Sequence, residues 1–121
     1  EEAMRWRSAS REIKAEVMRR GWNRKMGTFT FAYDMPLTDS SLLAIPLNGM
    51  LPPSHPSVHS MVKRIEHELV YNHLVARNIF EPTPFLLTTY WLARYYIAAG
   101  QRDKARRIID HLKFDLNKPV K

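Results

Sequence analysis

The sequence predicts an all-α fold built from antiparallel helical hairpins, with one short β segment near residues 28–33. Two pairs of helices, at 38–69 and 84–114, support this prediction, because in each pair an apolar helix precedes an amphipathic one. A third observation is the single glycine, Gly100, between the last two helices, which forces them into a hairpin. Alternating hydrophobic and striped helices are typical of an α/α barrel or solenoid, in which inner and outer helices alternate.

The first predicted helix covers residues 2–20. Its apolar residues form a narrow stripe at helical spacing, so the helix needs a partner surface, and Trp6 is expected to be an anchor in the core. Gly21 is expected to end this helix in the left-handed conformation. The stripe consists of Ala3, Trp6, Ala9, Ile13 and Val17.

Residues 28–33 alternate between threonine or alanine and aromatic side chains. This period of two predicts a short strand with Phe29, Phe31 and Tyr33 on one face. A single strand has unpaired edges and must pair with another segment. Residues around Arg24 are one candidate for that partner.

The next helix is expected to be capped by Thr38 or Asp39 and to be buried, since its leucines and isoleucine face nearly all directions. Pro46 should kink this helix or mark its end. Residues 52–56 form an extended linker, and Pro56 takes the first position of the following helix. That helix carries a regular apolar stripe made of Val58, Met61, Val62, Ile65 and Leu69.

The segment from 70 to 82 is the hardest to interpret. Residues 74–80 are compatible with a short strand or with an irregular loop that ends at Pro82. Residues 85–99 are expected to form a fully buried helix that stops at Gly100. Residues 101–114 then form an amphipathic helix with Ala105, Ile108, Ile109 and Leu112 on one face.

Composition limits the possible classes of function. The 121 residues, 45% hydrophobic and 26% charged, are typical of one globular domain. There is no apolar run of transmembrane length and no signal peptide, so no membrane partner is expected. The absence of cysteine excludes disulfides, thiolate catalysis and sulfur-based zinc sites, and it fits a cytoplasmic protein.

The net charge of +7 suggests nucleic-acid binding, but the pattern of charge argues against it. Basic residues lie on the outer faces of separate helices with acidic residues between them, as on solvated surfaces. His55 and His59 have the spacing of helical metal ligands, yet His55 precedes Pro56 and no carboxylate completes the set. We therefore expect no nucleic-acid partner, no metal and no cofactor.

Several segments, taken in order, resemble glycoside hydrolase family 15, and in particular its prokaryotic glucoamylase and trehalase branch. The resemblance covers nearly the whole chain. It is carried by Trp22-Asn, Gly27-Thr-Phe, Asp39-Ser-Ser-Leu-Leu-Ala-Ile-Pro-Leu-Asn-Gly-Met-Leu-Pro-Pro, Ile65-Glu-His-Glu-Leu, Phe85-Leu-Leu-Thr-Thr-Tyr-Trp-Leu-Ala and Ala99-Gly-Gln-Arg-Asp-Lys-Ala-Arg.

The resemblance implies an (α/α)6 toroid that releases glucose from α-linked glucosides with inversion of configuration. Inversion requires two carboxyl groups about 6.5–9.5 Å apart, one acting as general acid and one as general base. The resemblance places both catalytic glutamates outside residues 1–121, which also begin in mid-helix. We therefore expect a partial toroid domain that contains no catalytic residue and is inactive by itself.

The resemblance also implies two substrate-binding candidates. Related enzymes carry an arginine in the loop before the Phe-Leu-Leu helix that reaches into the sugar pocket, and Arg77 matches it. A guanidinium suits paired sugar hydroxyls, because it presents several donors in one plane. Relatives often have a glutamate three residues before the equivalent of Phe85. Pro82 takes that place here, so Glu81 is the second candidate.

A non-catalytic helical interaction or scaffold module is the alternative interpretation, since alternating helices also build solenoids. The two predicted helix pairs share little beyond hydrophobicity, which weakens the repeat interpretation. A partial toroid should also expose apolar helix faces where neighbouring helices are absent. Self-association through those faces is expected.

Overall fold

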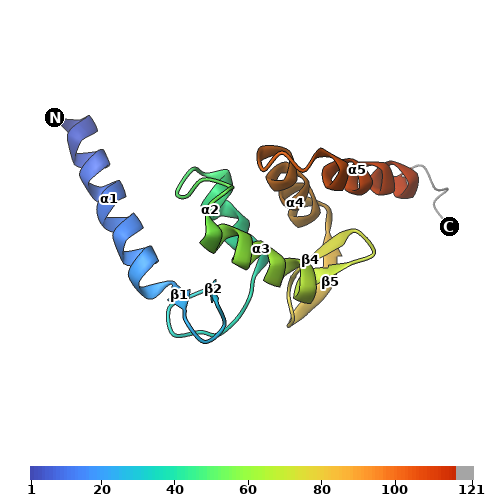
Figure 1. The fold of residues 1–121 in the computed structure, drawn as a ribbon, viewed down its shortest axis with the longest axis horizontal. Coiled ribbons are helices and arrows are strands. Elements are labelled where there is room, and N and C mark those ends of the chain that lie inside the picture. The colour runs from blue at the N-terminus through green and yellow to red at the C-terminus, as the bar shows by residue number, and fades with distance from the viewer. Residues whose placement is uncertain (117–121) are drawn as a thin grey trace.

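The computed structural model describes residues 1–116 of the chain, with side chains described as far as Lys113. Helices predominate, as predicted, but two small antiparallel sheets make the all-α description incomplete. Figure 1 shows the elements in order along the chain. They are α1 (Glu2–Arg20), β1 (Trp22–Asn23), β2 (Thr28–Phe29), the 3-10 helix η1 (Ser40–Leu43), α2 (Ala44–Leu47), α3 (Pro56–Leu69), β3 (Val70–Tyr71), β4 (Leu74–Asn78), β5 (Glu81–Phe85), α4 (Leu86–Ala98) and α5 (Arg102–Leu116).

Helix α1 has the predicted bounds, but it projects away from the other elements (Figure 1). None of its residues is buried, and Trp6 is 69% exposed, so the expectation of a core anchor is wrong for this chain. The physical reason is that only the C-terminal end of α1, at Val17 and Met18, packs against the core. The apolar stripe therefore reaches the core only through its last member, Val17.

Gly21 follows α1 with a right-handed φ of −76°, so the predicted left-handed cap is wrong. Its N–H continues the helical pattern and donates to the Val17 carbonyl at 2.7 Å. The chain then enters β1 directly and does not need a left-handed residue there. A Cβ at this position would lie 2.6 Å from the same carbonyl oxygen. Close approach, and not positive φ, therefore explains the glycine.

Strand β2 is shorter than predicted. Its partner is β1, which ends at Asn23, so the partner strand lies next to Arg24, where one was considered. Trp22 lies opposite Phe29, with ring centroids 5.1 Å apart in an edge-on contact. Phe29 is buried, whereas Phe31 is 42% exposed, so the predicted common aromatic face is wrong. The reason is that the chain leaves the sheet after Phe29, and the Phe31 N–H donates to the Leu37 carbonyl.

The segment after Thr38 is helical but short, with one turn of 3-10 helix followed by one turn of α-helix. Asp39 caps it as predicted, accepting the Ser41 N–H at 2.8 Å. The helix ends directly after Pro46, at Leu47. Pro56 takes the first position of α3, and the entire predicted stripe of α3 is buried.

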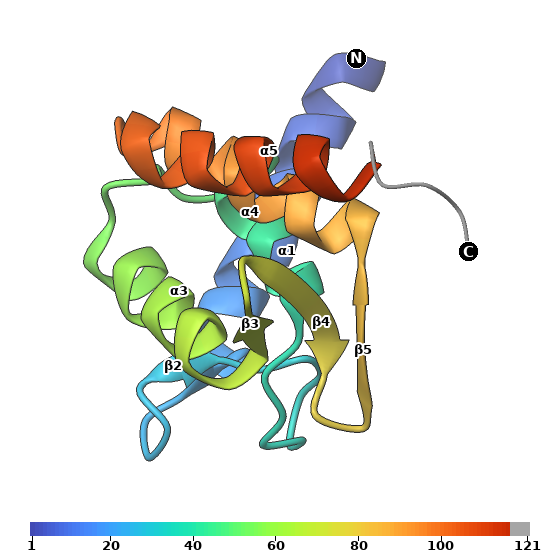
Figure 2. The ribbon, with the colours of Figure 1, turned by 90° about the vertical axis from the view of Figure 1, so that its right-hand side faces the viewer.

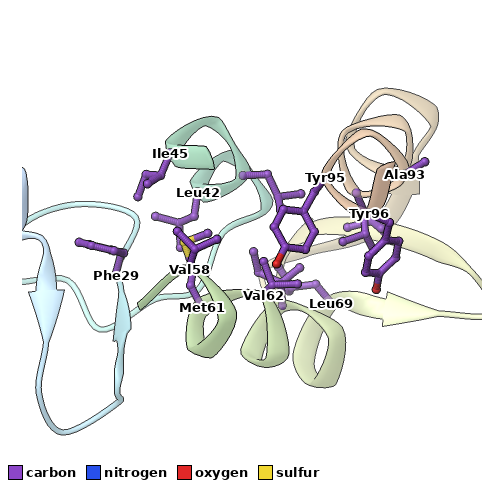
Figure 3. Close-up of a cluster of buried hydrophobic side chains, with 14 of the residues drawn as sticks. Phe29, Leu42, Ile45, Val58, Met61, Val62, Leu69, Ala93, Tyr95 and Tyr96 are labelled. Carbon is purple, nitrogen blue, oxygen red and sulfur yellow. The ribbon is translucent and has the colours of Figure 1, made fainter. Parts of the chain in front are cut away.

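The stripe of α3 forms the centre of the hydrophobic core (Figure 3). Phe29 of β2 and residues of η1 and α2 cover one end of it, and the tyrosines of α4 cover the other. Burial of this apolar surface supplies the main stabilising free energy of the segment. The labelled members of the cluster in Figure 3 are Phe29, Leu42, Ile45, Val58, Met61, Val62, Leu69, Ala93, Tyr95 and Tyr96.

The ambiguous segment is a strand, β4, at the centre of the three-stranded sheet β3–β4–β5 (Figure 2). Asn72 and His73 connect β3 to β4 in a two-residue turn, and both have positive φ. Hairpins of this length favour such turns, because their backbone twist matches that of the strands. Val75 of β4 is fully buried beneath α4.

Helices α4 and α5 form the predicted hairpin, joined through Gly100 at a φ of +77°. The expectation that the first of them is fully buried is wrong, because Leu86 is 59% exposed. Helix α4 is apolar on all sides, but among the described residues only one side packs, against η1, α2, β4 and α5. The exposed apolar side chains of this helix are Leu86, Leu87, Tyr90 and Ile97.

Candidate functional site

The β4–β5 hairpin positions both predicted substrate-binding residues. The register of the two strands shifts between Ala76 and Asn78, and Arg77 lies at this irregularity. Such bulges redirect side chains and are frequent next to functional sites. Glu81 begins β5 on the other side of the turn, and its Oε2 lies 3.6 Å from Arg77 Nη1. The structure therefore brings the two candidates together.

A buried carboxylate lies on the other side of Arg77. Asp39 is 0% exposed, and its Oδ2 is 3.7 Å from Arg77 Nε. The same oxygen accepts a hydrogen bond from Asn78 Nδ2 at 2.9 Å. The backbones of Asp39 and Asn78 also form an isolated antiparallel bridge. These contacts join the start of η1 to the end of β4.

A pocket of about 300 Å³ opens beside this cluster. Its volume is at the lower end of the range for small-molecule sites, about 300–1,000 Å³. Three of its eight lining residues are aromatic or aliphatic and five are polar or charged, and Arg77 is the only cation among the described residues that line it. The lining residues are Asp39, Ser40 and Ser41 near η1, Arg77 of β4, Phe85 of β5, and Leu87, Thr88 and Trp91 of α4.

Only one of the two candidates lines the pocket. Arg77 belongs to its wall, whereas Glu81 contacts Arg77 from outside the lining. The sequence predicted a helix cap at Asp39 and placed both Asp39 and Trp91 within motifs of the resemblance, but it predicted neither as a substrate-binding residue. A buried acidic residue at the cap of a one-turn helix carries no separate signal in the sequence. Only its hydrogen bond with Asn78, 39 positions away in the sequence, shows that Asp39 also belongs to the cluster beside the pocket.

The pocket can bind an uncharged polar ligand. The half-exposed guanidinium offers several N–H donors, and the aromatic walls can pack against the apolar faces of a ring. Asp39 is the only carboxylate in the lining, and it is already bonded to Ser41 and Asn78. The described residues therefore provide a binding surface without a pair of carboxylates suited to acid–base hydrolysis.

Of the two histidines with metal-ligand spacing, His55 has a structural role and His59 is exposed on α3. His55 caps α3, and its Nδ1 accepts the Ser57 N–H at 3.1 Å. Within residues 1–116, no group of three or more histidine, cysteine, aspartate or glutamate side chains is arranged to hold a metal ion. In the same part of the chain, no helix combines the length and apolar character needed to cross a membrane.

A second polar cluster links α3 to the α4–α5 hairpin. Glu66 Oε2 accepts hydrogen bonds from Tyr96 Oη at 2.7 Å and from Lys104 Nζ at 3.2 Å. Burial, and then the hydrogen bond to Glu66, raise the pKa of Tyr96. Because Tyr96 is also part of the core, this cluster fixes the position of α4, which carries one wall of the pocket.

Comparison with known proteins gives relatives of a single kind. The trehalase of Mycobacterium tuberculosis is 31% identical over 119 residues, which cover 91% of this chain and 17% of that protein. Trehalase 1 of Sulfolobus acidocaldarius is 36% identical over 104 residues, which cover 82% of this chain and 18% of that protein. The chain is a homologue of trehalases. It spans less than a fifth of the length of either of these two proteins.

Comparison with solved structures shows which fold the chain shares. A wild-type glycosidase matches with a TM-score of 0.76 at 23% identity, covering 93% of this chain and 30% of that one. A variant glycosidase structure matches with a TM-score of 0.77 and the same coverage. No family model matches the sequence. The chain therefore has the fold of part of a glycosidase, and the resemblance to glycoside hydrolase family 15 is confirmed.

Proposed function

We propose that residues 1–121 are part of an (α/α)6 catalytic domain of an inverting, trehalase-like α-glucoside hydrolase. The observation that carries this proposal is similarity to trehalases along 91% of the chain. The longer enzyme would release glucose from an α-linked glucoside such as trehalose. The alternative, a non-catalytic helical scaffold, is not favoured, because the curated relatives are trehalases.

In this proposal, the pocket beside Arg77 binds one glucosyl unit. Its volume of about 300 Å³ and its aromatic wall support binding of a single ring. Arg77 would donate hydrogen bonds to sugar hydroxyls through its terminal nitrogens. Glu81, 3.6 Å from Arg77, would contact the sugar at the rim or orient the guanidinium from outside.

The catalytic acid and base would come from parts of the enzyme beyond these residues. Asp39 is the only carboxylate that lines the pocket among the described residues, whereas inversion needs two. The chain by itself is therefore expected to bind sugar without hydrolysing it. Cytoplasmic location is part of the same proposal and is supported by the absence of cysteine.

Sugar binding can be measured with the isotopically labelled chain by NMR titration with glucose and trehalose. Arg77→Gln should weaken binding roughly 10-fold or more, because a hydrogen bond to a charged group contributes about 1.5–3 kcal/mol. Glu81→Gln should have a smaller effect. Arg106→Gln removes an exposed arginine of α5 and serves as the matched control.

Two results would contradict the proposal. Equal affinities of the wild-type, Arg77→Gln and Arg106→Gln chains for sugar would show that Arg77 does not bind sugar in this pocket. Glucose release from trehalose by the purified 121-residue chain would show that the reactive carboxylates lie within it.

A further inference from the structure

Asp39 is held in one position by contacts from two distant segments. Its Oδ1 accepts the Ser41 N–H at 2.8 Å, and its Oδ2 accepts Asn78 Nδ2 at 2.9 Å. The side chain is fully buried, and its backbone is bridged to that of Asn78. Both oxygens are therefore fixed relative to η1 and β4.

Asn78 cannot exchange its oxygen and nitrogen without loss of other bonds. Its Oδ1 accepts the backbone N–H groups of Phe80 at 2.9 Å and Glu81 at 3.1 Å. The NH2 group must then face Asp39, because an oxygen there would meet another oxygen. The β4–β5 turn thus determines which group faces the carboxylate.

Arg77 is the more exposed partner of this buried anion. Its side chain is 47% exposed, and Nε lies 3.7 Å from Asp39 Oδ2. A buried carboxylate is costly unless cations or hydrogen-bond donors compensate for it. Arg77 is the only cationic side chain that contacts Asp39 among the described residues. The carboxylate therefore attracts the guanidinium toward the wall of the pocket.

We propose that Asp39 is the positioning residue for Arg77, holding Nε so that the terminal nitrogens are ready to meet the hydroxyls of a bound sugar. This inference rests on the proposed function of the pocket. An arginine side chain has several rotatable bonds, and ordering them during binding would reduce affinity. An anchor that orders the arginine beforehand removes part of that cost.

The size of the effect follows from the rotamers that become accessible. Each freed torsion has three staggered states, so the fraction of Arg77 in the productive state would fall about threefold for one freed torsion and about ninefold for two. The apparent Kd rises in inverse proportion to that fraction. Loss of the anchor should therefore weaken sugar binding about 3- to 10-fold.

An exchange of the two buried side chains provides a specific test. In the Asp39→Asn/Asn78→Asp variant, residue 39 can still cap η1 and residue 78 can still accept the Phe80 and Glu81 N–H groups. The hydrogen bond between the two side chains is also kept, with donor and acceptor reversed. Arg77 Nε, however, would face an amide NH2 in place of a carboxylate oxygen. The exchange preserves the link and moves the carboxylate away from Nε to position 78.

The first measurement is the NMR signal of the Arg77 Nε–H, which needs no ligand. We expect a distinct, motionally restricted signal in the wild-type chain, because the ion pair with Asp39 favours one orientation of the guanidinium, and an averaged, more mobile one in the exchange variant. Asp103→Asn, which removes an exposed carboxylate of α5, should leave the signal unchanged. The same signal in the wild-type and exchange variants would overturn the proposal.

The second measurement is glucose titration of the same chains. The exchange variant should bind about 3- to 10-fold more weakly than the wild type, and Asp103→Asn should bind equally well. If the wild-type chain binds no glucose, the proposed function fails, and the Nε–H signal still decides whether Asp39 positions Arg77. If circular dichroism shows that the exchange variant is unfolded, Asp39→Ser keeps a capping side chain and removes the charge.

Discussion

Two adjacent threonines at the start of α4 attach this helix to the central strand β4. The buried Val75 N–H donates to Thr89 Oγ1 at 2.9 Å, and Thr88 Oγ1 donates to the Val75 carbonyl at 2.7 Å. Thr89 is fully buried and also donates to the Phe85 carbonyl at 2.6 Å. Thr89→Val keeps the shape of the side chain and removes its hydroxyl.

The expected cost follows from the partners that remain. The Val75 N–H would stay buried without its acceptor, which costs about 1–3 kcal/mol. Loss of the bond to the Phe85 carbonyl adds about 0.5–1.5 kcal/mol. The free energy of unfolding should therefore fall by about 2–4 kcal/mol. With a urea m-value of about 2 kcal/mol/M, the unfolding midpoint would fall by about 1–2 M.

Urea unfolding followed by far-UV circular dichroism measures this change. Thr89→Ser retains the hydroxyl and should lose clearly less stability than Thr89→Val. Thr83→Val makes the same chemical change at an exposed position of β5 and should alter the midpoint little. If Thr89→Val and Thr83→Val give the same midpoint, the hydroxyl of Thr89 does not stabilise the fold.

Two further predictions concern the second polar cluster and the exposed surface. The raised pKa of Tyr96 implies full stability below about pH 10, where unfolded tyrosine titrates, and a loss of stability as pH rises further. Urea unfolding between about pH 8 and 11.5 should show a shallower loss for Tyr96→Phe, whereas the exposed-site control Tyr71→Phe should follow the wild type. The exposed apolar side of α4 should cause concentration-dependent association in light scattering, which Leu86→Lys and Ile97→Lys reduce. A wild-type chain that stays monomeric at all concentrations would contradict this last prediction.

The sequence predicted those elements whose signals are local. The stripe of α3 repeats at helical spacing, Pro56 marks its start, and all its predicted apolar residues are buried. Thr38 or Asp39 was expected to cap the next helix, and Asp39 does so by accepting the Ser41 N–H. Gly100 adopts the positive φ that a tight helical joint favours.

Other expectations were wrong because they depended on partners that a local pattern does not specify. The stripe of α1 has the period of a packed helix, yet Trp6 is exposed. Helix α4 is apolar on all sides, yet only one side packs among the described residues. A hydrophobic pattern indicates which surface favours burial, but burial also requires a second surface in contact with it.

The sequence alone determined the order of the main helices, the position of the central core helix and the similarity to trehalases. These depend on periodicity, caps and motif order, all of which act over a few residues or one segment. Tertiary structure decided that residues 74–78 form a strand, because that strand pairs with β5 and bonds to the threonines of α4. It also brought Asp39 to Arg77, since attraction between charges depends on distance in space and not on separation along the chain.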